Sequence, residues 1–177
     1  MNVHESIPLI DNTLGEFAQT IGRDLAGYRN HVYRLVNFAY AFGEFDEEAQ
    51  TKIAIAACFH DVGIWPSRTL DYLEPSAARA GKYLAENGME NWQIQIGEMI
   101  RQHHKLSNYK SDPMVEAFRK GDLVDFSLGI IKCGLPRSFV SEVKAAFPNR
   151  GFHKCLAGVA SRWIIRHPLN PVPVLRF

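Results

Sequence analysis

Hydrophobic positions recur every three or four residues along most of the chain, which is the period of an α-helix with one buried face. No stretch alternates hydrophobic and polar β-branched residues for long enough to predict a strand. The sequence therefore predicts an all-α fold of about seven to eight helices. They are expected over residues 14–25, 28–42, 46–60, 75–87, 91–105, 113–124, 136–148 and 152–166.

Residues that favour helix ends set several of these boundaries. Asp46, followed by two glutamates, is a good N-cap for the third helix, and Asp112 before a proline is a good N-cap for the sixth. Asn91 can cap the fifth helix, and Gly27 is expected to separate the first helix from the second. Residues 64–73 are interpreted as a loop.

Length and charge narrow the classes of function. A chain of 177 residues with 46% hydrophobic residues fits one domain with a substantial core. The 20 Lys and Arg residues nearly balance 19 Asp and Glu residues, for a net charge of +1. This balance gives no support for a nucleic-acid polymer or an acidic membrane surface as partner. A small anionic substrate is compatible with it, because a local pocket can be basic within a neutral molecule.

Nothing in the chain predicts export or membrane insertion. No window approaches 18 uninterrupted apolar residues, so no transmembrane helix is expected. The first eleven residues lack the cationic start and the long apolar stretch of a signal peptide. The widely spaced Cys58, Cys133 and Cys155 form neither a disulfide framework nor a metal-binding knuckle. We interpret them as reduced packing residues of a cytoplasmic protein.

The candidate chemistry begins at His60 and Asp61, which directly follow the apolar run Ile53–Phe59. Two ionisable side chains at the end of such a run must be paired, solvated or bound to a metal. Alone, His31 could be a hydrogen-bonded core histidine and Asp122 a solvated carboxylate. Imidazole and carboxylate groups from several helices can also converge on one divalent ion, and this mixture of ligands suits Mn, Fe, Co, Ni or Zn.

The order of these residues resembles a known family. His31, then His60 and Asp61, then Asp122 match the H…HD…D pattern of the HD-domain superfamily of metal-dependent phosphohydrolases. The resemblance covers about residues 28–128. Within that range, residues 57–64 are similar to the family's signature, in which hydrophobic residues flank the HD pair and a glycine follows. Gly121–Asp125 looks like the family's final motif, a ligand aspartate followed three residues later by a second aspartate.

The resemblance implies a fold, a ligand set and a cofactor. The fold would be one HD-type helical domain over residues 1–177, with its core at 28–128 and C-terminal helices and a proline-rich tail at 136–177. The ligands of a single divalent transition metal would be His31, His60, Asp61 and Asp122. Asp125 would be a structural residue beside them.

Two adjacent histidines, His103 and His104, form the next candidate group. Adjacent residues in a helix diverge by about 100°, so the two are not expected to bind one ion together. The helical period that includes Ile96 and Ile100 puts His103 on the inner face, and His104 is not excluded. The family often has a histidine here that binds phosphate or a second metal. We favour one metal, because no other histidine lies between His60 and His103.

The leading hypothesis is hydrolysis of a small phosphate ester or anhydride, such as a nucleotide. Asp61 would act in catalysis as ligand and hydrogen-bond acceptor for the attacking water, supported by His103 and His104. A cationic group should neutralise the developing charge. The candidates for substrate binding are Arg34, Arg68 and Lys105, and each could instead be a solvated surface charge.

Two alternatives remain open. Residues 70–80 are similar to a region of cyanamide-hydratase-like HD proteins, and a hydratase would need a small apolar pocket lined by groups such as Phe59, Trp65 and Tyr72. The chain lacks the acidic residue that follows the HD pair in a nucleotidase branch, since Ile64 and Trp65 stand there. The other alternative is a module that binds a nucleotide without turning it over.

Two polar or extended segments could form part of a homodimer interface. Leu106–Asp112 is polar and expected to be exposed. The tail from Pro168 to Val174 is too rich in proline for a helix, and we expect an extended strap that packs on this subunit or on a neighbour.

Overall fold

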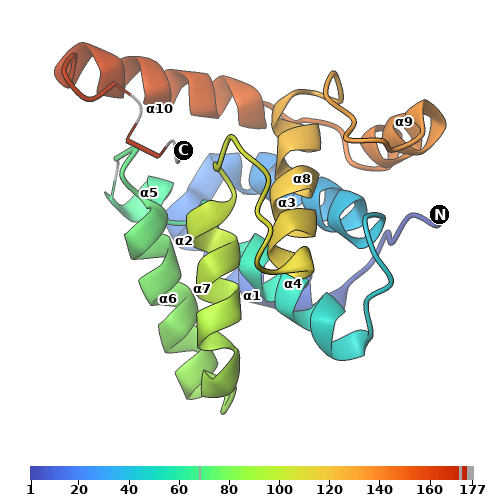
Figure 1. The fold of residues 1–177 in the computed structure, drawn as a ribbon. Helices are drawn as coiled ribbons and strands as arrows, with labels where there is room; N and C mark the ends of the chain where they lie inside the picture. The colour runs from blue at the N-terminus through green and yellow to red at the C-terminus, as the bar shows by residue number, and fades with distance from the viewer. Residues whose placement is uncertain (68, 172, 175–177) are drawn as a thin grey trace.

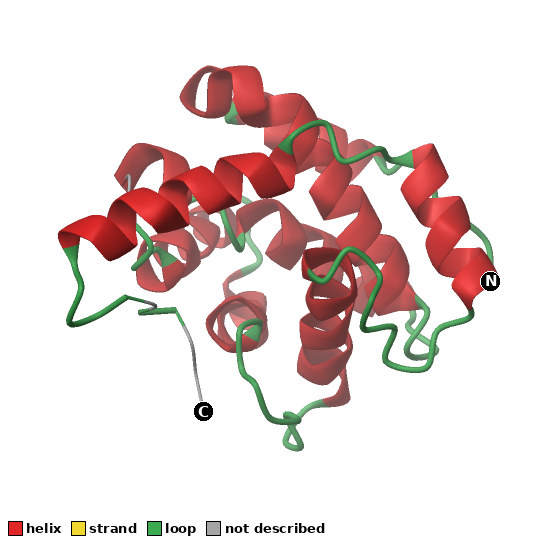
Figure 2. Cartoon of the chain, turned by 90° about the horizontal axis from the view of Figure 1, so that it is seen from above, coloured by secondary structure: helices red, strands yellow, loops and turns green. Residues whose placement is uncertain are grey.

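Figures 1 and 2 show the fold in a computed structural model, which describes residues 1–67, 69–171 and 173–174. These residues form a single helical domain without a β-strand, so the predicted all-α class is confirmed. Its eight longer helices are α1 (Pro8–Glu16), α3 (Leu25–Tyr40), α4 (Glu47–Phe59), α6 (Leu73–Glu86), α7 (Gln93–Gln102), α8 (Pro113–Phe126), α9 (Arg137–Ala146) and α10 (Phe152–Arg166). Its shorter elements are α2 (Ala18–Ile21), α5 (Ile64–Ser67) and 3₁₀ turns at Gly22–Asp24 and Glu90–Trp92.

Helices α3, α4 and α8 form the centre of the molecule. The apolar run Ile53–Phe59 of α4 is buried along its whole length, and α8 lies along α3. A glycine makes the approach of α8 to α3 possible. A Cβ atom on Gly121 would lie 2.8 Å from the carbonyl oxygen of Leu35 and 2.9 Å from the amide nitrogen of Ala39. The backbones of the two helices are therefore in contact one residue before Asp122.

The N-terminal helices differ from the predicted ones. We predicted helices over 14–25 and 28–42 with Gly27 between them, whereas α1 begins at Pro8 and Gly27 lies inside α3. Gly27 serves packing, since a Cβ there would lie 3.0 Å from the carbonyl oxygen of Arg150 and 3.2 Å from the amide nitrogen of Phe152. The glycine lets the start of α10 approach α3, so its signal of a helix break was misleading.

Two of the three predicted helix caps are present. Asp46 accepts a hydrogen bond from the amide of Ala49 at 2.8 Å, and Asp112 accepts one from Met114 at 2.7 Å. The prediction for Asn91 is wrong, because that residue lies within the 3₁₀ turn that leads into α7. The predicted loop after the HD pair is also partly wrong, since Ile64–Ser67 forms α5.

Helix α10 lies across the top of the molecule and makes less contact with it than the central helices do (Figures 1 and 2). Of its residues only Phe152 is fully buried. The chain returns beneath α10, where Val174 packs with a small apolar cluster that includes Leu70 and Tyr72. The predicted strap therefore packs on its own subunit over this part. No helix in the described part of the chain is both long and apolar enough to cross a bilayer.

Candidate metal centre

Four helices bring together the four predicted ligands and His103, which was predicted to act in catalysis. His31 comes from α3, Asp122 from α8 and His103 from the end of α7, while His60 and Asp61 directly follow α4. None of these five side chains belongs to a residue more than 4% exposed. Burial of so many ionisable groups at one point is costly unless they neutralise each other or hold an ion.

The turn after α4 is shaped by a second close contact. The amide of Gly63 donates to Ser76 Oγ at 3.0 Å, and a Cβ at this position would lie 2.8 Å from both Ser76 Oγ and the carbonyl oxygen of Tyr72. A side chain there would push the turn away from the start of α6. The glycine after the HD pair therefore lets the chain leave α4 with His60 and Asp61 directed at the centre.

The ligand atoms are close enough for one ion. His31 Nε2 lies 2.9 Å from His60 Nε2, and Asp61 Oδ2 lies 3.4 Å from His60 Nε2 and 3.8 Å from His31 Nε2. Asp122 Oδ1 lies 3.6 Å from His31 Nε2 and 3.8 Å from His60 Nε2. Metal bonds to such ligands measure about 2.0–2.2 Å, so ligand atoms up to about 4.4 Å apart can share an ion.

In each of the three buried imidazoles, the Nδ1 nitrogen, which points away from the centre, has a hydrogen-bond partner. His60 Nδ1 donates to the carbonyl of Ala57 at 2.8 Å, His103 Nδ1 donates to that of Ile100 at 2.7 Å, and His31 Nδ1 contacts Asp125 Oδ2 at 2.6 Å. In the neutral rings each Nε2 then carries a lone pair directed into the centre. Two such lone pairs at 2.9 Å repel, and a metal ion or a shared proton between them removes that repulsion.

Two further atoms point to a cation. Asp61 Oδ1 and His103 Nε2 are buried without a hydrogen-bond partner in the described residues, and they lie 3.6 Å apart. Buried polar atoms are almost always satisfied in folded proteins. A carboxylate oxygen and an imidazole lone pair are both acceptors, so the partner they need is a cation or a donor such as water. These residues therefore fit a divalent metal ion.

The pKa values favour the deprotonated ligands. Burial lowers the pKa of His60 to about 3, so its ring is neutral at physiological pH. Burial would raise the pKa of Asp61, but the neighbouring rings of His60 and His103 bring the pKa below its ordinary value. Burial raises the pKa of Asp122 to about 6. At pH 7 the His60 ring is therefore a neutral nitrogen ligand, and the carboxylates of Asp61 and Asp122 are anionic oxygen ligands.

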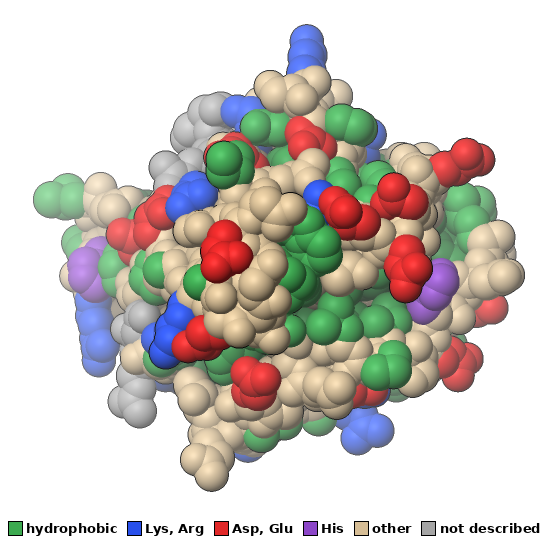
Figure 3. Space-filling view, turned by 90° about the horizontal axis from the view of Figure 1, so that it is seen from below, with side chains coloured by type: hydrophobic (Ala, Val, Ile, Leu, Met, Phe, Trp, Pro, Cys, Tyr) green, Lys and Arg blue, Asp and Glu red, His purple; other side chains and the backbone are tan. Residues whose placement is uncertain are grey.

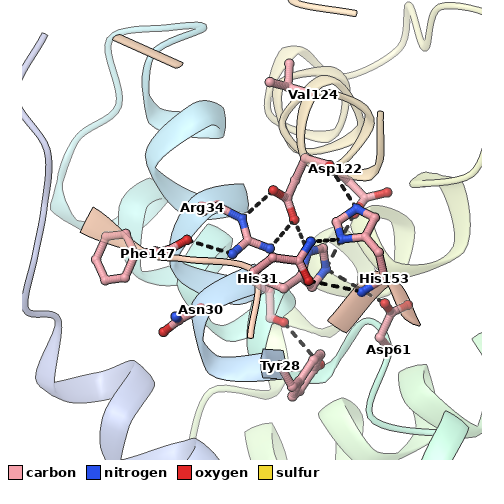
Figure 4. Close-up of polar contacts among 12 residues, drawn as sticks. Tyr28, Asn30, His31, Arg34, Asp61, Asp122, Val124, Phe147 and His153 are labelled. Carbon is pink, nitrogen blue, oxygen red and sulfur yellow. Dashed lines mark hydrogen bonds and ion pairs between the residues drawn. The ribbon is translucent and has the colours of Figure 1, made fainter. Parts of the chain in front are cut away.

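Asp125 lies behind His31 and fixes its ring. Arg34 Nη2 donates to Asp125 Oδ2 at 2.9 Å, and Arg34 Nη1 donates to the carbonyl of Phe147 at 2.8 Å (Figure 4). Burial would raise the pKa of Asp125, but the bonds from His31 and Arg34 lower it to about 2. The guanidinium that we predicted as a substrate ligand is thus committed to an internal ion pair. Substrate binding by Arg34 stays a prediction, and these bonds favour a structural role.

His103 and His104 both lie beside the centre. The expectation that they could not share an ion is wrong: although the backbone of His103 keeps helical angles at the end of α7, the two ring centroids are only 3.9 Å apart. His104 Nε2 contacts the hydroxyl of Tyr72 at 2.7 Å. Three groups of residues are spaced to hold an ion, namely His31 with His60 and Asp122, His60 with Asp61 and His103, and His103 with His104 and Asp122.

Lys105 and Arg68 are the other two residues predicted to bind substrate. The backbone carbonyl of Lys105 accepts a hydrogen bond from Arg119 Nη1 at 3.1 Å, which ties the loop after α7 to α8. Arg68 lies outside the described residues.

Sequence reasoning missed three aromatic neighbours of the centre. Phe152 stacks on His31 with ring centroids 4.1 Å apart, and Tyr28 stacks on His60 at 6.2 Å. The Nε2–H of His153 donates to the backbone carbonyl of Asp125 at 3.1 Å. Phe152 and His153 are remote in sequence from the motif, and no local pattern identified them. Tyr28 lies one turn before His31, so its helical spacing could have suggested contact with the site.

Comparisons of this chain with known protein families, with curated proteins and with solved structures found no match. The chain has a helical fold with a buried His and Asp cluster whose members are close enough to hold a metal ion.

Proposed function

We propose that this protein is a metal-dependent hydrolase of the HD type. The observation that supports it is the convergence of His31, His60, Asp61 and Asp122, which form the H…HD…D pattern and meet within 3.8 Å in the pairs measured. These residues are far apart in sequence, and a purely structural helical protein gives no reason to bury them together.

In this proposal, these four residues hold one divalent transition ion such as Mn, Fe, Co, Ni or Zn. An ion bound there would lower the pKa of a water and polarise the oxygen of the group under attack. The distances of 2.9–3.8 Å between the ligand atoms of these four residues support a single shared ion.

The chain's own residues position the reacting groups. Asp61 Oδ1 has no hydrogen-bond partner in the described part of the chain and is an acceptor able to orient a water. Burial would lower the pKa of His103, but the nearby carboxylates of Asp61 and Asp122 raise it. A protonated His103 can donate to a developing anion, so we assign it the role of general acid or electrostatic stabiliser. Tyr72 holds His104 beside it.

We propose a small phosphate ester or anhydride, such as a nucleotide, as the substrate. Both histidines after α7 are available to contact a phosphoryl oxygen. One observation favours a second candidate, the hydration of a small neutral group such as a nitrile. Arg34, one helical turn after His31, is bound to Asp125 and to the carbonyl of Phe147, so its guanidinium is not free to neutralise a phosphate.

Phosphate release tests the first candidate. The pure protein and Asp61→Ala would be assayed with nucleotides and sugar phosphates in the presence of added Mn, Co or Ni. We expect release by the protein and at least a hundredfold less by the variant, the scale of removing a group that acts in the transition state. The exposed Asp71 is the matched control, and Asp71→Ala should retain activity.

Metal content and circular dichroism would be measured on the same samples. A folded Asp61→Ala that keeps its full metal content would contradict the ligand assignment. If the protein holds metal but releases no phosphate with any substrate, the hydratase and the nucleotide-sensing alternatives would replace phosphate hydrolysis. Ammonia or urea analysis with nitrile-type substrates would then separate those two.

A further inference from the structure

A second concave site lies outside the metal centre, between α10 and the short elements α2, Gly22–Asp24 and α5. Its cavity measures about 920 Å³, a size typical of small-molecule sites. One face of α10 forms its wall, because Lys154, Gly158 and Arg162 follow one another at helical spacing. Figures 1 and 2 show α10 across the top of the molecule, so this groove is on a different side from the face in Figure 3.

Positive charge collects in this groove although the whole chain is nearly neutral. Five of the 20 Lys and Arg residues line it: Arg23, Arg150, Lys154, Arg162 and Arg166. In contrast, the face seen from below shows acidic and hydrophobic side chains interspersed, with basic ones mainly near its edges (Figure 3).

Most of the positive charge in the groove has no acidic partner among the described residues. Asp24 is the acidic residue in the lining, and it accepts hydrogen bonds from Trp65 Nε1 at 3.2 Å and from Cys155 Sγ at 3.4 Å. Its nearest cation is Arg23 Nε at 3.9 Å. Within the described residues, the other four cations of the groove have no carboxylate within 4.0 Å. Unneutralised like charges in a concave surface concentrate anions from solution.

Aromatic and small residues complete the groove. Trp65 and Trp163 both line it and are partly exposed. Gly158 leaves open space on the α10 wall, since a Cβ there would meet only Arg162 Nη2, at 3.6 Å. A glycine in a helix interior costs about 1 kcal/mol relative to alanine. At this position the glycine widens the groove between the cationic side chains.

We propose that this groove binds a small molecule that carries a polyphosphate chain, as a ligand site separate from the metal centre. Several guanidinium groups in one cavity match the spaced charges of such a chain, because each can bind phosphate oxygens in a bidentate manner. The two indole groups provide a surface on which a nucleobase can stack. The same charges could accept inorganic polyphosphate, and the two sources are distinguished by experiment.

The groove also contacts residues next to the metal centre. The rings of Trp65 and Tyr28 have centroids 4.8 Å apart, and Phe152 of α10 stacks on His31. A ligand in the groove would therefore lie close to the residues that pack around the metal ligands, on the side of those residues that faces away from the centre.

Calorimetric titration of the full-length protein with ATP and with tripolyphosphate tests this site. The titration is run in excess EDTA and repeated on Asp61→Ala, so that binding through the metal centre does not contribute. We expect one binding site in both cases, with an affinity that falls as salt rises. A tenfold or greater preference for ATP assigns the ligand to the nucleotides, and equal affinity assigns it to polyphosphates in general.

Two pairs of variants locate the binding. Arg162→Gln with Arg166→Gln should weaken binding by about tenfold or more, because two charge-assisted contacts are lost. Arg79→Gln with Arg137→Gln removes the same charge from exposed positions outside the groove and should leave the affinity unchanged. Gly158→Leu fills the groove with a side chain that favours the helix and should abolish binding, whereas Gly158→Ala should change the affinity less than threefold.

The proposal is overturned if neither compound binds, or if the two charge-removing pairs weaken binding equally. It is also overturned if a single-stranded oligonucleotide binds while ATP and tripolyphosphate do not, since the ligand would then be a polymer. Because the titration excludes metal, its failure would leave the proposed hydrolase function unaffected.

Discussion

At the scale of single residues, the candidate metal centre depends on Asp125, which is not one of the proposed metal ligands. Asp125 connects two buried groups, since it orients His31 and neutralises Arg34. Groups that orient a metal-binding histidine typically change metal affinity by 10- to 100-fold when they are removed. The pair with Arg34 also lies in a part of the core that is closed to water.

Asp125→Asn should therefore impair both metal binding and stability. We expect metal affinity to fall by about 10- to 100-fold. We expect the free energy of unfolding to fall by about 3 kcal/mol, because Arg34 is left as a buried charge without a full partner. Metal titration and urea denaturation measure the two effects.

A surface pair is the control for this variant. Asp11 binds Arg29 at 2.8 Å with both side chains more than a third exposed. Asp11→Asn should cost less than about 1 kcal/mol, since water screens exposed ion pairs. Equal losses of stability in the two variants would show that burial of the Asp125 pair has no special effect.

At the scale of helices, the contact between α3 and α8 sets the distance between His31 and Asp122. Gly121 permits this contact, so Gly121→Ala should push the two helices apart. We expect a loss of about 1–3 kcal/mol in unfolding free energy, the usual cost of overpacking, together with weaker metal binding. Thermal unfolding and metal titration test this.

Gly15→Ala is the matched control, because a Cβ at Gly15 in α1 would meet nothing within 4 Å. That variant should be as stable as the parent or more stable, given the higher helix propensity of alanine. A Gly121→Ala protein with unchanged stability and metal affinity would mean that the backbone contact is not needed.

The loop between α7 and α8 is held by one glutamate. Glu116 accepts hydrogen bonds from Arg119 Nε at 2.7 Å and from the amide of Tyr109 at 2.8 Å, and Arg119 in turn binds the carbonyl of Lys105. Burial would raise the pKa of Glu116, but these donors lower it below 4.5. This loop directly follows His103 and His104, so the glutamate helps to fix the position of both.

The sign of the pH effect follows from the lowered pKa. The folded protein binds the proton of Glu116 less readily than the unfolded chain does, so this group stabilises the fold above about pH 4.5. Its contribution is lost as the pH falls through the lower pKa of the folded state. Glu116→Gln should cost about 1–2 kcal/mol at pH 7 and should lose less stability than the parent as the pH falls below about 5. Urea denaturation at several pH values measures this, and parallel pH curves for the two proteins would contradict it.

At the scale of the whole molecule, a bound ion should couple α3, α4 and α8 and stabilise the fold. The folded state holds the ligands in place and the unfolded chain does not, so metal at 100 times its dissociation constant adds about 2.7 kcal/mol. For a chain of this size that is a rise in Tm of about 5–10 °C.

Addition of EDTA to the metal-loaded protein should therefore lower Tm by about 5–10 °C, and addition of metal should restore it. Asp61→Ala should show no such shift. Differential scanning calorimetry gives the values. An EDTA-insensitive Tm, in a protein from which EDTA demonstrably removes the metal, would mean that the ion does not link the helices.

The sequence by itself determined the helical class and most of the helices, and its resemblance to the HD superfamily implied the four proposed metal ligands. The helices depend on local signals, namely a period of three to four residues and the caps Asp46 and Asp112. Hydrophobic burial and helix capping act over one or two turns, so a linear pattern records them.

Only the tertiary structure decided which residues surround the ligands. The packing of α10 brought Phe152 to His31, and the end of α7 at Gln102 brought two adjacent histidines to one site. Tertiary packing also placed Arg34 within hydrogen-bond distance of Asp125. It formed the groove under α10 that five Lys and Arg residues line. Such contacts join residues many positions apart, and they depend on how helices approach each other, which no local period encodes.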